Sequence, residues 1–188
     1  MTSDGAELVD SRVVYRSQVF DVAEQRFRFA DGVEHARSVV QHPGAVAIVA
    51  LDDAGRWLLI EQFRLPAGAV LLEIPAGTLE PGEAPEVTAQ RELREETGFA
   101  AASIERLGGT WMAPGFCTEF IHYFVARGLR VDPLPHDADE RISAPLAYTF
   151  DEVLAAIDAG RICDAKSVAA ALLYERWTRG RGGAASRA

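Results

Sequence analysis

The chain has 188 residues, of which 48% are hydrophobic and 25% are charged, and its formal net charge at pH 7 is −9. A chain of this length buries about 70% of the surface that its unfolded form exposes, which supports a single core without disulfides or a structural metal. The acidic balance excludes general binding to nucleic-acid duplexes, and no apolar run approaches the length of about 18 residues that a membrane span needs.

The N-terminal region predicts a small antiparallel β-sheet. Residues 12–20 and 25–29 are rich in β-branched and aromatic residues, and Asp31-Gly32 marks a hairpin turn into a third strand. Three strands alone bury little surface, so this sheet must pack on the core or on another subunit. We assign residues 1–43 to it and expect it to be a dimerisation region.

The middle of the chain predicts a larger sheet around one helix. Residues 44–51 form an almost unbroken apolar run, and after a turn the stretch 56–64 is also strand-like. Further strands are expected at residues 70–74, 103–110 and 119–127. A helix is expected over about residues 84–97, because Pro85 suits a first helical position and Gly98 suits the left-handed position just past a helix end.

Two more helices are predicted near the C-terminus. The first begins at a capping box formed by Thr149 and Glu152, and the second covers about residues 164–178. Residues 179–188 are expected to be a disordered tail. Strands on both sides of a central helix, followed by a helix pair, predict an α/β fold for residues 44–178, with a mixed sheet between helices in an α/β/α sandwich.

The strongest functional signal is the stretch GTLEPGEAPEVTAQRELREETGF, residues 77–99. On its helix Glu92 and Glu96 are one turn apart and Glu95 follows Glu92 by three residues, so three carboxylates share a face. Like charges so close repel each other unless a cation lies between them. Carboxylate oxygens suit Mg²⁺ or Mn²⁺ better than zinc. The alternative is a solvated acidic helix face.

The spacing of these residues resembles the Nudix box. The defined positions are filled by Gly77, Glu83, Arg91-Glu92-Leu93, Glu95-Glu96 and Gly98. Other segments resemble the ADP-ribose pyrophosphatase branch of that family: the N-terminal strands, HPGAVAIVAL, EQFR, EIPAG, Pro114 and GRICDAKS. The resemblance covers nearly all of residues 12–177 and implies the same sandwich fold.

The resemblance implies hydrolysis of a diphosphate that joins a nucleoside to another group. ADP-ribose, cleaved to AMP and ribose 5-phosphate, is the expected substrate. A nucleotide sugar or another nucleoside diphosphate derivative is an alternative that the sequence barely separates from it. A third possibility is a Nudix-like domain that senses nucleotides without cleaving them, against which the intact carboxylate set argues.

The resemblance also assigns the residues of the box. Glu92 and Glu96 are implied to bind the metal, with Glu95 a third or outer ligand and the carbonyl of Ala76 joining them. Metal ions neutralise the oxygens around phosphorus, so that water can attack it. Glu83 and Arg91 are implied to form a structural ion pair that braces the loop against the helix.

Several residues outside the box are candidates for binding substrate, and the resemblance implies this role for two of them. Arg64 matches a phosphate-contacting arginine, whose planar fork binds phosphate oxygens bidentately. Arg37 matches an arginine that reaches the partner subunit's substrate in a homodimer, although Ser38 replaces the acidic residue usually beside it. Glu73 contacts substrate or helps bind metal. Apart from the resemblance, Phe20 and Phe27 are candidates for stacking on adenine, or simple core residues of an alternating apolar pattern.

The residue that activates water need not lie in the box, because glutamates that bind metal are poor bases. In the stretch HDADERISAP, Glu140 matches an acidic residue on a loop before the first C-terminal helix. Asp137, Asp139 and the box residue Glu95 are its rivals for this role.

The chain's two cysteines, Cys117 and Cys163, have no zinc-binding spacing, and its first ten residues lack the basic and apolar parts of a signal peptide. A cytoplasmic protein with two free thiols is therefore expected.

Overall fold

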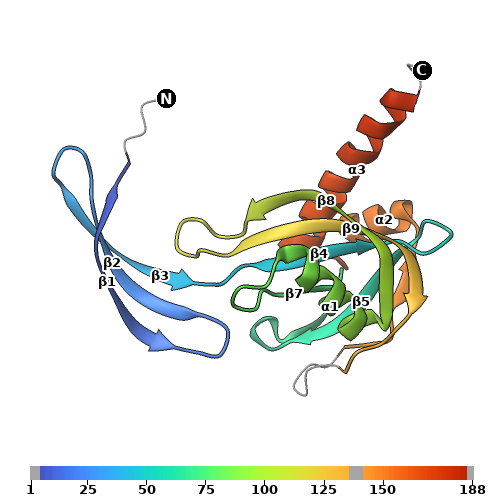
Figure 1. Cartoon of the computed structure of the whole chain (residues 1–188), viewed down its shortest axis with the longest axis horizontal. Helices are drawn as coiled ribbons and strands as arrows, with labels where there is room; N and C mark the ends of the chain where they lie inside the picture. The colour runs from blue at the N-terminus through green and yellow to red at the C-terminus, as the bar shows by residue number, and fades with distance from the viewer. Residues whose placement is uncertain (1–4, 136–141, 186–188) are drawn as a thin grey trace. The chain divides into compact units, whose positions relative to one another are not determined.

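The computed structural model describes residues 5–135 and 142–185 (Figure 1). The chain forms two compact units, Met1–Gly44 with Trp111–Phe120, and Ala45–Thr110 with Ile121–Ala188. The sequence predicts only residues 1–43 as a separate part. The segment Trp111–Phe120 joins them because the backbone of Val40 hydrogen-bonds to its residues, with N 2.8 Å from Phe116 O and O 2.9 Å from Thr118 N.

The first unit contains a three-stranded antiparallel sheet, which confirms the small N-terminal sheet. Strands β1 (Glu7–Arg16), β2 (Asp21–Arg28) and β3 (Glu34–Gln41) lie in the order β1-β2-β3 (Figure 1). Gly32, at φ 83°, allows the turn between β2 and β3, because a residue with a side chain rarely adopts this conformation. Among residues 5–44, Ala23 is the single buried hydrophobic side chain, so the sheet has little core of its own.

The second unit is built on two sheets. A four-stranded sheet has the order β7-β4-β9-β8, in which β4 pairs antiparallel to β7 and parallel to β9. A three-stranded antiparallel sheet has the order β10-β5-β6. The strands are β4 (Ala45–Ala50), β5 (Trp57–Arg64), β6 (Ala69–Glu73), β7 (Ala76–Thr78), β8 (Phe99–Trp111), β9 (Phe120–Val131) and β10 (Leu146–Tyr148). All six residues of β4 are buried, as expected for a strand that is covered on both faces.

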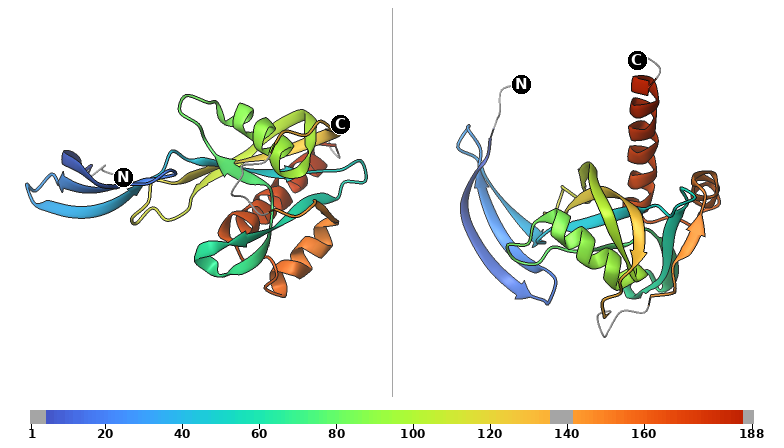
Figure 2. Two further views of the ribbon diagram at one scale, coloured as in Figure 1. Left: turned by 90° about the horizontal axis from the view of Figure 1, so that it is seen from below. Right: turned by 45° about the vertical axis from the view of Figure 1, so that its right-hand side comes forward.

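Helices cover both sides of the strands in this unit. Helix α1 (Pro85–Thr97) packs against β4 and β7, whereas α3 (Ala165–Ala185) packs against β4 and α2 (Phe150–Asp158) against β10. The left view of Figure 2 shows α1 on one side of β4 and β9, and α2 and α3 on the other. The predicted α/β/α sandwich with a mixed sheet is therefore confirmed.

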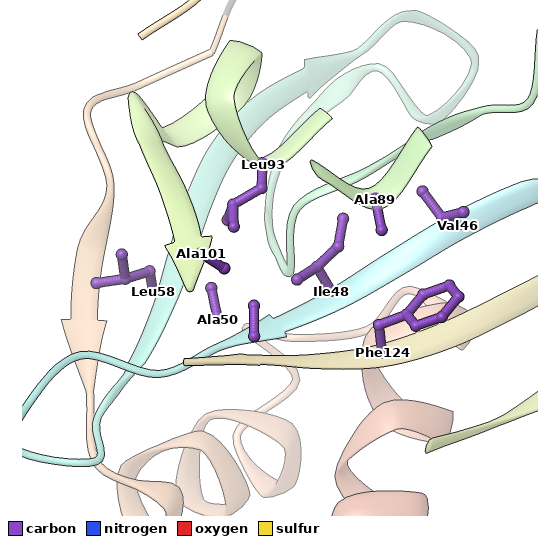
Figure 3. Close-up of a cluster of buried hydrophobic side chains, with 9 residues drawn as sticks. Val46, Ile48, Ala50, Leu58, Ala89, Leu93, Ala101 and Phe124 are labelled. Carbon is purple, nitrogen blue, oxygen red and sulfur yellow. The ribbon is translucent and has the colours of Figure 1, made fainter. Parts of the chain in front are cut away.

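The hydrophobic core lies between β4 and α1 (Figure 3). Val46 and Ile48 on β4 and Leu93 on α1 have no exposed surface. The other buried members of the cluster are Ala50, Leu58, Ala89, Ala101, Phe124 and Ala126. This packing fixes the rotation of α1, and with it the direction of the box glutamates.

The C-terminal helix differs from its prediction, because α3 includes residues 179–185, which the sequence assigns to a disordered tail. Arginine and alanine favour helix, so the helix continues through a stretch that also holds three glycines. Within residues 5–135 and 142–185, no helix has both the length and the apolar character needed to cross a bilayer.

Candidate active site

Helix α1 presents the carboxylates of the box toward strand β7. Its N-cap is Ala84, Pro85 occupies the first turn, and it ends at Gly98 in the left-handed conformation with φ 78°. Because the Leu93 side of the helix is anchored in the core, Glu92 and Glu96 are held at 8% and 2% exposure. The Glu96 carboxylate accepts a hydrogen bond from the backbone N–H of Ala76, N to Oε2 2.8 Å.

Gly77 makes the closest approach between β7 and the helix. A Cβ atom built on Gly77 would lie 1.8 Å from Cδ of Glu92 and 2.0 Å from its Oε1. No side chain fits there without displacing this carboxylate. The φ angle of Gly77 is not in the left-handed region, so backbone conformation does not require a glycine here. The glycine is required because the Glu92 carboxylate occupies the space of a side chain.

Arg91 binds three of the box glutamates. Its Nη2 lies 3.1 Å from Glu83 Oε2, and its Nη1 lies 2.7 Å from Glu92 Oε1 and 2.9 Å from Glu95 Oε2. Its Nη2 also donates to the carbonyl of Thr78 at 3.2 Å. Burial works against the charge of this guanidinium, but its contact with Glu83 and the charges of Glu92 and Glu95 outweigh burial and raise the pKa of Arg91.

The contact between Arg91 and Glu83 is the ion pair that the resemblance implies for these residues. It links the loop that precedes α1 to the helix itself. Glu83 also accepts a hydrogen bond from Thr88 Oγ1 at 2.8 Å. The hydrogen bond from Arg91 and the one from Thr88 outweigh burial and lower the pKa of Glu83.

The donor set of this site fits a hard divalent cation. Three carboxylates, from Glu92, Glu95 and Glu96, lie along one helix face, and that of Glu96 is hydrogen-bonded to the backbone of Ala76. Oxygen ligands of this kind are those that Mg²⁺ and Mn²⁺ prefer. In the present geometry Glu92 and Glu95 are paired with the guanidinium of Arg91. No three acidic, histidine or cysteine side chains within the described part of the chain lie close enough together to hold a metal ion.

A second charged cluster lies where β6 ends and α3 begins, and we call its members, Arg64, Glu73, Asp164 and Lys166, the Arg64–Lys166 cluster. Arg64 Nε lies 3.0 Å from Glu73 Oε1 and its Nη2 lies 2.6 Å from Oε2. Lys166 Nζ contacts the same Glu73 carboxylate and lies 2.9 Å from Asp164 Oδ2. The Glu73 side chain is 1% exposed, so its charge is balanced by these two cations and not by water.

The cluster and the box interact electrostatically, as the pKa shift of Arg64 indicates. Burial disfavours the ionised form of Glu73, but the hydrogen bond from Arg64 and the charge of Lys166 outweigh it and lower the pKa of Glu73. Burial likewise opposes the charge of Arg64, whereas Glu73, Glu96 and Asp164 outweigh burial and raise its pKa. The charge of the box residue Glu96 thus contributes to the raised pKa of Arg64.

The structure brings together most, but not all, of the predicted site residues. One group gathers around α1: Ala76, Gly77, Glu83, Arg91, Glu92, Glu95, Glu96 and Gly98. Arg64 and Glu73 contact each other in the same unit. Arg37 and Phe20 belong to the first unit, where Arg37 Nη1 donates to Ala36 O at 2.9 Å and Phe20 is 37% exposed. Glu140 lies outside the described residues.

The sequence predicts no role for Lys166 and Asp164, although both lie in the segment GRICDAKS. One signal was present, because Lys166 is the single lysine in a chain with eighteen arginines. Its partner Glu73 is 93 residues away along the chain, so no local spacing could have revealed the contact.

Comparison with known proteins identifies the family of the chain. A family model described as NUDIX domain matches residues 41–170. An ADP-ribose pyrophosphatase of Bacillus subtilis (strain 168) is 36% identical over 156 residues, covering 82% of this chain and 84% of that protein. A methanol dehydrogenase activator of Bacillus methanolicus is 40% identical over 166 residues, covering 87% and 86%. A GDP-mannose pyrophosphatase of Yersinia enterocolitica serotype O:8 / biotype 1B (strain NCTC 13174 / 8081) is 34% identical over 133 residues, covering 66% and 69%.

Among solved structures, the crystal structure of an ADP compounds hydrolase is similar to the whole fold, with a TM-score of 0.81 at 25% identity over 94% of this chain and 96% of that chain. The family model spans the box, both sheets of the second unit and the start of α3. The resemblance carried by Gly77, Glu92 and Glu96 is thereby confirmed. The chain belongs to the Nudix hydrolase family.

Proposed function

We propose that this hydrolase cleaves the diphosphate bond of ADP-ribose, giving AMP and ribose 5-phosphate, with Mg²⁺ or Mn²⁺ as its cofactor. The observation that carries the proposal is the row of carboxylates from Glu92, Glu95 and Glu96 on one face of α1, of which Glu96 accepts a hydrogen bond from the backbone N–H of Ala76. The ADP-ribose pyrophosphatase of Bacillus subtilis supports the choice of substrate.

Different residues of this chain are proposed to bind the metal, to bind the phosphates, to position these groups and to activate water. Glu92 and Glu96, with Glu95 and the carbonyl of Ala76, are the proposed ligands of the metal, which when bound would neutralise phosphate oxygens and stabilise charge in the transition state. Arg64 is proposed to bind a phosphate group bidentately. Arg91 and Glu83 hold the helix and its preceding loop in register, so that the carboxylates keep their positions. Glu140 remains our prediction for the water-activating base.

A panel of ADP-ribose, GDP-mannose, other nucleotide sugars and dinucleotides, each assayed with and without Mg²⁺, tests this proposal. We expect ADP-ribose to give the highest kcat/KM and activity to vanish when EDTA removes divalent ions. Glu96→Gln is expected to lower kcat at least about a hundredfold while the protein stays folded, because charge stabilisation is lost. Near-normal turnover of a folded Glu96→Gln variant would contradict the assignment.

A nucleotide sugar is the second candidate substrate. The GDP-mannose pyrophosphatase relative favours it, although it covers less of the chain than the ADP-ribose pyrophosphatase relative does. Both substrates present the same diphosphate to Arg64 and to the carboxylates of α1. The panel separates them, since a higher kcat/KM for GDP-mannose than for ADP-ribose would make the nucleotide sugar the preferred substrate.

We also propose that the protein acts as a homodimer through its N-terminal sheet. Among residues 5–44 the single buried hydrophobic side chain is Ala23. Large apolar side chains are exposed on β1, at Leu8, Val14 and Tyr15, and between the strands, at Val19, Phe20, Phe29 and Val33. A sheet of this size gains stability from apolar cover. In this dimer Arg37, and Phe20 as an adenine-stacking residue, would contribute to a substrate site of the partner.

A further inference from the structure

Lys166 is an exception in the composition of the chain. Every other basic residue is arginine, yet the position where the Glu73 and Asp164 carboxylates converge holds the single lysine. Its side chain is 12% exposed, so the ammonium lies in a confined space. An ammonium is a compact point charge, whereas a guanidinium is a wide planar fork. The smaller of the two cations thus occupies this position.

Arg64 is bound to Glu73 through one edge of its guanidinium. Nε and Nη2 donate to the two oxygens of Glu73, at 3.0 Å and 2.6 Å. Nη1 makes no hydrogen bond within residues 5–135 and 142–185, and the side chain is 36% exposed. The outer end of the guanidinium, Nη1 with Nη2, is thus available to a second anion while the first edge stays on Glu73.

The buried charge of Glu73 limits what Arg64 can do alone. A carboxylate that is 1% exposed requires paired cations, because water does not solvate it. If Arg64 were its single partner, an arriving phosphate would compete with Glu73 for the guanidinium. With Lys166 also bound to Glu73, the carboxylate stays neutralised when Arg64 shares its charge with a second anion.

The first turn of α3 fixes Lys166 in this place. Asp164 Oδ2 accepts from the backbone N–H of Ser167 at 3.0 Å, as well as from Lys166. Ser167 Oγ accepts from the backbone N–H of Ile74, the residue after Glu73, at 3.0 Å. Ser167 is 1% exposed. The end of β6 and the start of α3 are therefore joined by the hydrogen bond from Ile74 N–H to Ser167 Oγ as well as by the ion pair of Lys166 with Glu73.

We propose that Lys166 is a positioning residue for diphosphate binding: by holding Glu73, it keeps Arg64 oriented with its outer end available to the phosphates of the substrate. This rests on the proposed function, in which Arg64 contacts the diphosphate, and it adds the residue that orients Arg64. Lys166 itself touches no reacting atom and acts through Glu73 and Arg64.

Steady-state kinetics of Lys166→Met test the proposal. Methionine retains much of the length of the side chain and removes its charge. We expect KM for ADP-ribose to rise about tenfold or more while kcat stays within about threefold, because the interaction acts on binding of the diphosphate. Lys166→Arg, which keeps the charge in a larger group, should give an intermediate KM. A folded Lys166→Met protein with the KM of the wild type would overturn the inference.

Arg179→Met is the matched control. Arg179 lies on the same helix, its side chain is 75% exposed, and it pairs with Glu175 on its own helix. The substitution removes the same charge from α3 without touching the Arg64–Lys166 cluster, so KM should not change. An equal rise of KM in this variant would show a general charge effect and overturn the positioning role.

A measurement without turnover separates this inference from the proposed substrate. The side-chain Nε–H resonance of Arg64, assigned with an Arg64→Lys variant, reports the contact of Arg64 with Glu73 in the substrate-free protein. It should shift in Lys166→Met and not in Arg179→Met, and an unshifted resonance would overturn the inference. A shift supports it even if wild-type protein fails to cleave ADP-ribose, an outcome that rejects the proposed function alone.

Discussion

The Glu92 carboxylate of α1 lies where a side chain at Gly77 of β7 would be. This contact limits which substitutions either residue can accept. The backbone of β7 reaches the Glu92 carboxylate because Gly77 has no side chain. Arg91 contacts the same carboxylate, with Nη1 2.7 Å from Oε1. Gly77 and Arg91 therefore both constrain the position of this carboxylate, and a change in either one should act through geometry.

Gly77→Ala tests this arrangement. The added Cβ would lie 1.8 Å from Glu92 Cδ in the present geometry, so the carboxylate must move. We expect kcat to fall at least about a hundredfold, as for loss of a charge-stabilising group, with a cooperative unfolding transition retained. Gly180→Ala is the control, because a Cβ there meets nothing within 4 Å. Normal turnover in a folded Gly77→Ala protein would contradict the role of Glu92.

The pKa of Glu73 predicts how stability depends on pH. Its pKa is lowered in the folded protein from an ordinary value of 4.5, mainly by Arg64 and Lys166 acting against burial. A carboxyl with a lowered folded pKa stabilises the protein fully above its unfolded pKa, and this contribution is lost as the pH falls through the folded pKa. We therefore expect the Tm to fall as the pH drops below about 4.5, in a thermal melt followed by circular dichroism.

Glu73→Gln provides the comparison for that measurement. The variant should be less stable at neutral pH, because Arg64 and Lys166 lose their buried counter-charge. The Tm difference between the wild type and the variant should shrink as the pH falls through the window below about 4.5. A difference that stays constant with pH would show that Glu73 does not contribute through its charge.

The sequence could predict the residues of the box but not the whole site. Glu92, Glu95 and Glu96 share a helix face by their spacing alone, so their proximity follows from local structure. Lys166 meets Glu73 across 93 residues of chain, through packing that no periodicity records. Long-range ion pairs of this kind require the tertiary fold to be known.

At the scale of elements, the helices were easier to predict than the short strands. Proline and glycine mark the ends of α1, and the capping box of α2 is present as expected, with Thr149 and Glu152 hydrogen-bonded in both directions. Strands β7 and β10, three residues each, were not predicted. So short a strand has no detectable alternation and exists because it pairs with a longer neighbour, β4 or β5.

The lengths of β8 and β9 also exceed their predictions. β8 begins at Phe99, directly after the glycine that ends α1, and β9 extends to Val131 in a segment that the sequence marks as polar. At the end of β9, Arg94 donates to Asp132 through Nε to the carbonyl at 3.0 Å and Nη2 to Oδ1 at 3.1 Å. Strand β9 thus continues beyond its apolar residues, up to the point where Asp132 is hydrogen-bonded to Arg94 of α1.

At the scale of the whole molecule, the N-terminal sheet raises the question of assembly. Its strands pair well with each other, yet among residues 5–44 Ala23 is the single buried hydrophobic side chain. Several large apolar side chains of residues 5–44 are therefore left for another surface to cover. A second copy of the chain meets this need in the homodimer that we propose.

Deletion of residues 1–40 tests the dimer. We expect the truncated protein to have the mass of one chain in light scattering and to lose ADP-ribose hydrolysis, because the partner's contribution to the substrate site is removed. The second unit has its own core and should still unfold cooperatively. A mass of one chain for the active full-length protein would contradict the proposal.

The parallel pairing of β4 with β9 bears on how the chain folds as it leaves the ribosome. Ala45 pairs with Ile121 and Ala50 with Ala126, so one edge of the most buried strand has no partner until that later segment has been synthesised. An apolar strand with a free edge is prone to join other chains. Nascent chains that stop before residue 121 should therefore aggregate or require a chaperone, and the native core can close only after the last third of the chain begins to emerge.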